Sequence, residues 1–310
     1  MRILVVCSGN AGYISPFIKE QADSISALGN NVLIYPIIGK GILGYLINLK
    51  NIKKKIRDFK PDLIHAHYGL SGLLACFQRL VPTIITFHGS DGYILWVRIL
   101  SKIASRLSAF NIFVGVELKR RIKGHKRNTI MPCGVDLGKF YPIEKNIVRN
   151  LLNFSDRGIY ILFSSSFDNA IKNYPLAKKA LEKIQDEINL IEMKGKTREE
   201  VNLLLNACDL LLLTSISEGS PQIIKEAMAC NCPIVATDVG DIRWLLRDTV
   251  GCYIVSFDPD DIAEKIKMAM EFSKNVGRTN GRDRIIKLGL DSETIAKKII
   301  AIYEKVLNKN

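Results

Sequence analysis

The chain has 310 residues, of which 47% are hydrophobic and 24% charged, and its formal net charge is +13. This length allows two domains of ordinary size, and the composition indicates a globular, soluble protein. No apolar run is long enough for a membrane-spanning helix or a signal peptide, and the seven cysteines have no framework spacing, so we expect a cytoplasmic protein with reduced thiols.

The excess of positive charge lies in the first half of the chain. Residues 1–142 hold 20 of the 44 Lys and Arg and 7 of the 31 Asp and Glu, so residues 143–310 hold the remaining 24 of each kind. Much of the excess lies in two clusters: Lys50, Lys53, Lys54, Lys55, Arg57 and Lys60, and then Lys119, Arg120, Arg121, Lys123, Lys126 and Arg127. A basic face can bind nucleic acid, a polyanionic substrate or an anionic membrane. We do not expect nucleic acid, because the clusters lack interleaved aromatic residues and no recognition motif is present.

The apolar segment 41–49 immediately precedes the first basic cluster. Apolar and aromatic residues beside lysines fit a helix that lies on an anionic membrane surface, where each basic residue contributes about 1 kcal/mol. An ordinary amphipathic helix with a solvated basic face fits the same pattern. Both interpretations stay open at this point.

Residues 1–142 predict alternating strands and helices. Helical patterns lie at 17–28 and 94–107. Short apolar runs indicate strands at 3–7, 31–36, 62–67, 83–87, 111–114 and 129–131. This alternation predicts a mostly parallel, doubly wound α/β sheet that binds ligands at the carboxyl ends of its strands. The loops that follow the strands are therefore the places to look for a site.

Three strand ends in this half carry residues of chemical interest. The loop after the first strand contains Gly9 and Gly12 but lacks the full G-x-G-x-x-G pattern, so a dinucleotide oxidoreductase is not indicated. His65 and His67 point to one face of a strand and could bind a metal, but no third ligand lies nearby in sequence. A wall of an active-site cleft is the better interpretation. His88 ends the next strand and can present its imidazole to a ligand.

Residues 143–310 continue the alternation. Short apolar runs predict strands at 158–163, 189–193, 209–213, 233–237 and 251–255. The final helix is expected at 292–307. Its apolar face would consist of Ile295, Ile299, Ile302 and Val306.

The segment between the third and fourth of these strands should be a loop followed by a helix. Pro221 suits the first helical turn and Ser220 the N-cap position. Glu218 then lies in the loop, and Glu226 lies about one and a half turns inside the helix. A helix N-terminus attracts a phosphate, and carboxylates beside a phosphate act mainly as acceptors for hydroxyl groups. The pattern therefore predicts a ligand in which a sugar is joined to a phosphate.

Glu218, Glu226, the Ala-Met-Ala that follows and the strand end at 239–241 resemble the signature of retaining nucleotide-sugar glycosyltransferases of the GT-B fold. The resemblance implies an α/β architecture of two Rossmann-like domains that face each other across a cleft. It also implies that Glu226 holds the ribose hydroxyls and that Glu218 contacts the transferred sugar. The backbone that would lie against the sugar and the diphosphate belongs to Gly219, Ser220, Pro221 and Gln222.

The same resemblance implies roles for residues in other loops. The loop that holds Gly9 and Gly12 would face the donor phosphate and the acceptor, and His88 would reach the transferred sugar. Lys172 occupies the position of a lysine that binds the donor diphosphate. Ser166 occupies the position of an arginine that binds it too, so either helix N-terminal amides and hydroxyls or an arginine from elsewhere would have to compensate.

The segment 132–140 resembles the linker between the two domains of this family. We therefore expect an acceptor-side domain at 1–141 and a nucleotide-sugar donor domain at 142–310, with the last helix crossing back to the first domain. The chain departs from the family in length as well. It has room for only one strand, 189–193, where family members usually have two.

The resulting hypothesis is a transferase that moves a sugar from a nucleotide diphosphate sugar to a hydroxyl group with retention of configuration. The acceptor would be a saccharide or a lipid-linked group, in surface polysaccharide or glycolipid assembly at the inner face of a membrane. No metal or other cofactor is expected, because Lys172 and helix N-terminal amides would stabilise the leaving diphosphate. Two alternatives remain: a nucleotide-sugar epimerase of the same fold, and a catalytically silent homologue acting as a binding subunit, which Ser166 suggests.

Overall fold

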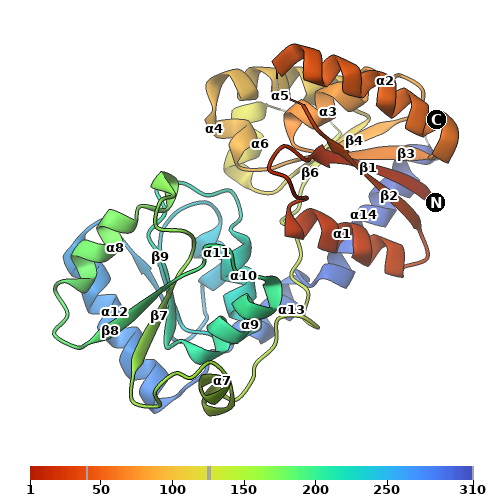
Figure 1. Ribbon diagram of the computed structural model, residues 1–310. Helices are drawn as coiled ribbons and strands as arrows, with labels where there is room; N and C mark the ends of the chain where they lie inside the picture. Colours follow the sequence, from red (N-terminus) through yellow and green to blue (C-terminus); the bar gives the residue numbers. More distant parts are fainter. Residues whose placement is uncertain (40, 124–126, 309–310) are drawn as a thin grey trace. The chain divides into compact units, whose positions relative to one another are not determined.

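The computed structural model describes residues 1–39, 41–123 and 127–308, and the chain divides into two compact units (Figure 1). Unit 1 comprises Met1–Gly134 together with Ser292–Asn310, and unit 2 comprises Val135–Asp291. The boundary expected from the sequence, near Tyr141, lies a few residues beyond the end of the first stretch of unit 1. Each unit is a parallel sheet with helices on its faces, as the sequence pattern predicts.

Unit 1 contains a sheet of six parallel strands in the order β2-β1-β3-β4-β5-β6. The strands are β1 Arg2–Ser8, β2 Asn31–Ile37, β3 Leu63–His67, β4 Thr83–Phe87, β5 Phe110–Phe113 and β6 Asn128–Ile130. The strands β3, β4 and β5 are buried along their whole length, as continuous apolar runs in a sheet covered on both faces should be. The predicted doubly wound fold is confirmed.

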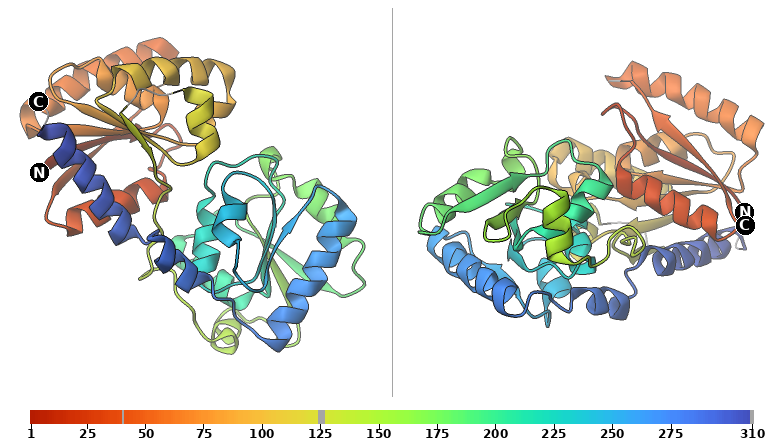
Figure 2. Two further views of the ribbon diagram at one scale, coloured as in Figure 1. Left: turned by 180° about the vertical axis from the view of Figure 1, so that it is seen from behind. Right: turned by 60° about the horizontal axis from the view of Figure 1, so that its bottom comes forward.

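Helices cover both faces of this sheet. They are α1 Pro16–Ala27, α2 Gly41–Phe59, α3 Gly69–Cys76, α4 Ser90–Tyr93, α5 Leu95–Leu107, α6 Val116–Ile122 and α14 Ser292–Leu307. On one face α14 packs against α1, and on the other α3 packs against α2 and α5 (Figures 1 and 2). The last helix therefore completes the core of the unit that the first residues of the chain begin.

The bounds of α14 agree with the prediction, but its buried face is rotated slightly. Ile295, Ile299 and Val306 are buried as expected, whereas Ile302 is only partly buried. Tyr303 takes the central position instead and is fully buried. Its hydroxyl oxygen lies 2.6 Å from the Nδ1 atom of His65, and this polar contact accounts for a tyrosine at this depth.

Unit 2 contains a sheet of five parallel strands in the order β11-β10-β9-β7-β8. The strands are β7 Ile159–Phe163, β8 Ile188–Glu192, β9 Leu210–Leu213, β10 Ile234–Thr237 and β11 Cys252–Val255. The helical segments are α7 Lys145–Leu151, η1 Ala170–Lys172, α8 Tyr174–Leu181, α9 Arg198–Ala207, α10 Gln222–Ala229, α11 Ile242–Leu246, α12 Pro259–Asn275 and α13 Gly281–Leu288. One strand, β8, lies between α8 and α9, as the sequence predicts.

The first basic cluster lies on α2. Ile52 and Ile56 are buried, whereas Lys54 and Lys55 are exposed, so this half of the helix has an ordinary apolar inner face and a solvated basic outer face. The predicted membrane segment 41–49 falls largely on side chains outside the described part, as does Lys126 of the second cluster. Within the described ranges, no helix has both the length and the apolar character needed to span a bilayer.

Candidate active site

The loops at the carboxyl ends of β7 and β9 in unit 2 are bonded to each other. The backbone N–H of Ile216 donates to the carbonyl oxygen of Ile171 at 2.9 Å, and the Thr214 hydroxyl donates to the carbonyl oxygen of Lys172 at 2.9 Å. These bonds place Lys172 at the end of η1 beside the loop that carries Glu218. Two residues that are far apart in the sequence and have predicted roles at one ligand are thus brought together.

Lys172 and Glu218 form an ion pair. The Nζ atom of Lys172 lies 2.5 Å from the Oε1 atom of Glu218, and the Ser215 hydroxyl donates to the same oxygen at 2.7 Å. Both charged side chains are mostly buried, with exposed fractions of 18% and 13%. Desolvation of both charges is costly, and the direct ion pair together with the Ser215 hydrogen bond offsets that cost.

Glu226 also has a cationic partner. Its side chain is 2% exposed, and its Oε1 atom lies 2.7 Å from an Nη2 atom of Arg198. Arg198 opens α9 and stacks its guanidinium over the Phe140 ring at 4.5 Å. Arg198 was not among the residues predicted from the sequence. The signal that could have found it is the capping box of Thr197 and Glu200, which fixes the start of α9 and so places Arg198 in its first turn.

The start of α10 differs from the prediction by one residue. The helix begins at Gln222, and Pro221 is its N-cap residue with a ψ of 123°, so Pro221 is extended rather than part of the first turn. Ser220 is therefore not the N-cap, and its hydroxyl instead accepts a hydrogen bond from the Nζ atom of Lys225 at 3.2 Å. A residue that precedes proline is restricted to extended conformations, which keeps Ser220 in the loop. Gly219 and Ser220 thus lead directly into the helix N-terminus, where free N–H groups point outward.

The loop after β10 supports the Glu218 loop from behind. Gly240 has a φ of +64°, and a Cβ atom at this position would lie 2.7 Å from the Gly219 carbonyl oxygen. Only glycine therefore fits this contact, on both steric and conformational grounds. The next residue, Asp241, has its pKa raised by burial, an effect that Lys225 and Ser220 oppose. Lys225 is fully buried, and the sequence analysis did not single it out.

Ser166 stands where the resemblance implies an arginine, and it provides no positive charge. The neighbouring Asp168 pairs with Lys194 at 2.6 Å, and hydrogen bonds from Lys194 and Ser166 hold the pKa of that carboxyl group below its usual value. Both predicted ways to compensate for the missing arginine, helix N-terminal amides and hydroxyls or an arginine from elsewhere, stay predictions. Arg198 reaches Glu226 rather than residue 166.

Unit 1 contains a cluster of three buried histidines at the ends of β3 and β4. The rings of His65 and His67 stack with their centroids 4.7 Å apart, which agrees with their predicted position on one face. The Nδ1 atom of His65 lies 2.6 Å from the Tyr303 hydroxyl oxygen, and its Nε2 atom lies 2.7 Å from the Thr86 hydroxyl oxygen. The Nδ1 atom of His67 lies 3.1 Å from the Nε2 atom of His88. The predicted contact of His88 with a sugar stays a prediction.

Asp91 joins the loops that follow β3 and β4. It is 1% exposed and accepts the backbone N–H groups of Gly69 and His88, each at 2.8 Å. Burial raises the pKa of Asp91 to about 7, although the two backbone hydrogen bonds oppose the shift. A carboxyl group that exchanges its proton near neutral pH can donate a hydrogen bond to a ligand hydroxyl or accept one from it.

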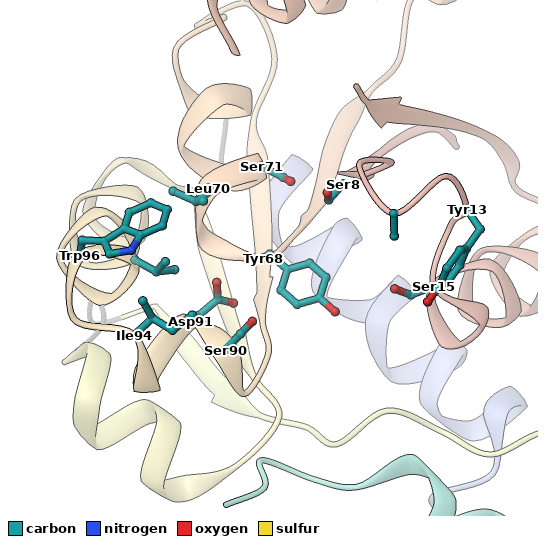
Figure 3. A pocket seen from close by; sticks show the side chains of 12 residues that line it. Ser8, Tyr13, Ser15, Tyr68, Leu70, Ser71, Ser90, Asp91, Ile94 and Trp96 are labelled. Atoms are coloured by element: carbon teal, nitrogen blue, oxygen red, sulfur yellow. The ribbon is translucent and has the colours of Figure 1, made fainter. Parts of the chain in front are cut away.

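Asp91 lines a cavity of about 390 Å³ within unit 1 (Figure 3). Ile94, Trp96 and Leu70 lie beside Asp91, while Ser8, Tyr13 and Ser15 come from the opposite side and Tyr68 lies between them (Figure 3). The remaining lining residues are Ala11, Ser71, Ser90 and Val97. This mixture of apolar surface and a few hydroxyl groups suits a ligand that has both an apolar part and a hydroxylated part.

The predicted glycine loop borders this cavity, and the two glycines differ in their structural roles. The backbone N–H of Gly9 donates to Ile37 at 2.8 Å, and a Cβ atom on Gly9 would lie 2.8 Å from the Cβ atom of Pro36. Gly9 is therefore required for packing against β2. Gly12 has a φ of +82°, and a Cβ atom there would meet nothing within 4 Å, so its requirement is conformational.

The buried titratable groups of unit 1 predict a loss of stability in acid. Burial lowers the pKa of His65 to about 3, and burial with the other histidines lowers that of His67 well below its usual value. Below about pH 6.5 the unfolded chain therefore binds two protons that the native state does not bind. The stability that comes from keeping these histidines neutral is present above pH 6.5 and is lost as the pH falls. Asp91 acts in the opposite direction, because its raised pKa lets the native state hold one proton between about pH 4 and 7.

For His65, His67 and Asp91 together, the unfolded chain holds one more proton than the native state between pH 5 and 6, which corresponds to roughly 1.4 kcal/mol of unfolding free energy lost for each pH unit of acidification. Urea unfolding at pH 5.0, 6.0 and 7.5 measures this slope. In Asp91→Asn the opposing proton is removed, so the slope should become steeper by roughly 1.4 kcal/mol per pH unit. A wild-type stability that is constant over this range would contradict the assignment of neutral histidines.

Comparison with known families agrees with the two-unit architecture. Residues 12–139 match the family described as Glycosyltransferase Family 4, and residues 168–271 match the family described as Glycosyl transferases group 1. The first match covers most of the contiguous part of unit 1, and the second covers the Lys172, Glu218 and Glu226 positions of unit 2.

Individual proteins are similar to this chain over most of its length. An uncharacterized glycosyltransferase of Methanocaldococcus jannaschii is 28% identical over 78% of this chain and 75% of its own length. The N,N'-diacetylbacillosaminyl-diphospho-undecaprenol alpha-1,3-N-acetylgalactosaminyltransferase of Campylobacter jejuni is 22% identical over 93% of this chain and 89% of its own. The crystal structure of Anabaena HepE in complex with UDP-glucose has a TM-score of 0.80 and 15% identity, covering 98% of this chain and all of that one.

Proposed function

We propose that this chain, which belongs to the group 1 glycosyltransferases and has the GT-B fold, transfers a sugar from a nucleotide diphosphate sugar to an acceptor hydroxyl with retention of configuration. The observation that carries the proposal is the convergence of three elements at one edge of the unit 2 sheet. Lys172 and Glu218 lie on two loops that are bonded to each other, and the Glu218 loop leads into the N-terminus of α10, the helix that carries the buried Glu226.

The chemistry of these groups matches the parts of such a donor. The N–H groups at the start of α10 and the ammonium group of Lys172 offer positive potential to a diphosphate. Glu226 accepts hydrogen bonds from the ribose hydroxyls, and Arg198 holds its carboxylate in position. Glu218 accepts hydrogen bonds from the transferred sugar. A nucleotide sugar is also the ligand named for Anabaena HepE, which supports a donor of this class.

The reaction breaks the bond between the anomeric carbon and the diphosphate oxygen and forms a bond from the same carbon to the acceptor oxygen. Negative charge develops on the departing diphosphate, and the ammonium group of Lys172 neutralises it. The proton of the acceptor hydroxyl passes to the diphosphate. Since the Lys172 ammonium group and the helix N–H groups stabilise the charge on the leaving diphosphate, we propose that neither a metal nor another cofactor is required.

The acceptor in this proposal occupies the cavity of unit 1. Its apolar lining and the carboxyl group of Asp91 suit a hydroxylated group carried on an apolar tail. The name of the Campylobacter jejuni relative gives an acceptor carried on diphospho-undecaprenol, which supports a saccharide or lipid-linked acceptor here. The corresponding setting is the assembly of a surface polysaccharide or glycolipid.

A calorimetric and thermal-shift screen against UDP, GDP, ADP and their common sugar conjugates tests the donor. A ligand present at a hundred times its dissociation constant should stabilise the protein by roughly 2.7 kcal/mol, which is well within detection. If no nucleotide binds, the alternative of a catalytically silent binding subunit is favoured. If a donor binds and is rearranged without any acceptor, product analysis identifies an epimerase instead.

A further inference from the structure

Helix α5 exposes an apolar stripe along its outer face. Leu95, Trp96, Ile99, Ile103 and Leu107 are each between 41% and 64% exposed. Four of them are spaced by four residues, so they form one continuous line along the helix. Single exposed apolar residues are ordinary, whereas a contiguous apolar surface on a folded domain marks a place where something docks.

The inner face of α5 explains why the large apolar residues lie outside. Its buried residues are Val97, Ser101, Ala104 and Ser105, three of them small. The helix packs against α3, and a Cβ atom on Gly69 of α3 would lie 1.9 Å from the Ser101 hydroxyl oxygen. This close approach admits only small side chains between the helices. The usual arrangement, in which the larger apolar side chains face the core, is therefore reversed.

The stripe is flanked by positive charge. Arg98, Lys102 and Arg106 also recur every four residues on α5, and none of them lies within ion-pair distance of a carboxylate in the described part of the chain. From residue 94 to residue 123, Glu117 is the only acidic residue. The neighbouring helix α6 packs against α5 and carries Lys119, Arg120 and Arg121, the last two of which pair with Glu117.

We infer that the outer face of α5 docks on an anionic lipid bilayer, with its apolar stripe inserted among the lipids and its basic flank against the headgroups. An apolar stripe edged by basic residues is the composition of an interfacial helix. Anionic headgroups complement the positive charge that surrounds the stripe. A second copy of the chain is a poorer partner, because the same face of each copy would bring like charges together.

The outer face of α5 lies next to the unit 1 cavity that the proposed function assigns to the acceptor. This step of the inference therefore rests on the proposed function. Trp96 belongs to the stripe and also lines the unit 1 cavity, together with Ile94 and Val97 (Figure 3). A bilayer against α5 therefore reaches one wall of that cavity. A lipid-linked acceptor can then present its hydroxylated head to the cavity while its tail stays among the lipids.

Trp96 provides a direct probe of docking. The chain has two tryptophans, and Trp244 on α11 in unit 2 can be changed to phenylalanine to leave Trp96 alone. We expect the emission of this Trp244→Phe protein to shift to shorter wavelength with vesicles of phosphatidylcholine and phosphatidylglycerol in equal parts, and to shift far less with phosphatidylcholine alone. Added salt should weaken binding to the anionic vesicles.

Matched double variants test which surface binds. Ile99→Ser with Ile103→Ser should weaken vesicle partitioning roughly 30-fold, and Lys102→Gln with Arg106→Gln should weaken it by a similar factor. The control is Lys54→Gln with Lys55→Gln on α2, which removes the same charge from another exposed basic face. It should stay within about threefold of the parent protein, because in this inference α2 does not contact the bilayer and salt screens charges that are away from its surface.

Three outcomes would overturn the inference. The first is an unchanged Trp96 emission with anionic vesicles, and the second is an equal loss of binding in the α2 control. The third is a dimer in the absence of lipid that the Ile99→Ser and Ile103→Ser changes dissociate, since the stripe would then be a self-association surface. Vesicle binding needs neither donor nor acceptor, so its failure leaves the proposed transfer reaction intact, and a transferase test with a soluble acceptor is independent of it.

Discussion

Lys172→Ala should lower the rate of sugar transfer at saturating donor by about 100- to 1000-fold, the range seen when one preorganised donor to a developing negative charge is removed. In the free protein the ammonium group is held 2.5 Å from Glu218, and its backbone is fixed by the Thr214 hydroxyl, so the charge is positioned before the donor arrives. The alanine variant loses this charge at the moment when the diphosphate departs. Steady-state kinetics with the donor identified by the nucleotide screen measures the effect.

Lys172→Arg provides the control, because it keeps the charge while changing its geometry. We expect it to recover part of the lost rate, since a guanidinium still neutralises a diphosphate. The melting temperature of both variants must be measured alongside, because removal of Lys172 leaves Glu218 without its described cation. An alanine variant that folds and retains the wild-type turnover number would exclude Lys172 from the reaction.

Glu226→Gln should weaken donor binding by about 10- to 100-fold, which is the loss of one charged hydrogen bond of roughly 1.5–3 kcal/mol. The substitution preserves the shape of a side chain that is almost completely buried, so a loss of affinity reports the charge rather than a cavity. Isothermal titration calorimetry with the donor measures the dissociation constant. Unchanged donor affinity in this variant would show that Glu226 does not hold the ribose.

Arg198→Gln separates the role of Glu226 from that of its partner. If Arg198 acts only by holding the Glu226 carboxylate, it should weaken donor binding less than Glu226→Gln does, and the double variant should bind no worse than Glu226→Gln alone. If the losses in the two single variants add in the double variant, Arg198 contacts the donor independently. That result would identify Arg198 as the cation that compensates for Ser166.

The fold could be predicted from the sequence because strands and helices each have a local pattern of apolar residues. Apolar runs of strand length placed every strand within about two residues, and the alternation with helical patterns predicted the parallel sheets. The start of α10 was misplaced by one residue because Ser220 and Pro221 suit adjacent cap positions equally well, and only the ψ angle of Pro221 decides between them.

The contacts within the site could not be read in the same way. Arg198 meets Glu226 across the space between two helices, and Tyr303 meets His65 from opposite ends of the chain. Neither pair has a characteristic spacing. Likewise, the sequence predicted the helix at 94–107 but not which face it would bury, because that depends on its close approach to Gly69 of α3. Partner choice between distant segments is a property of packing rather than of local pattern.

The assignment of α14 to unit 1 constrains how the protein is made. This helix is translated after the whole of unit 2, yet it supplies Ile295, Ile299 and Tyr303 to the core that β3 and α1 help to form. During synthesis unit 2 can fold as soon as it leaves the ribosome, whereas unit 1 still lacks the Tyr303 partner of His65 and has only α1 on the face of the sheet that α1 and α14 share. The unit translated first is therefore the last to be completed, and until α14 has been made the nascent chain holds a folded unit 2 and an incomplete unit 1.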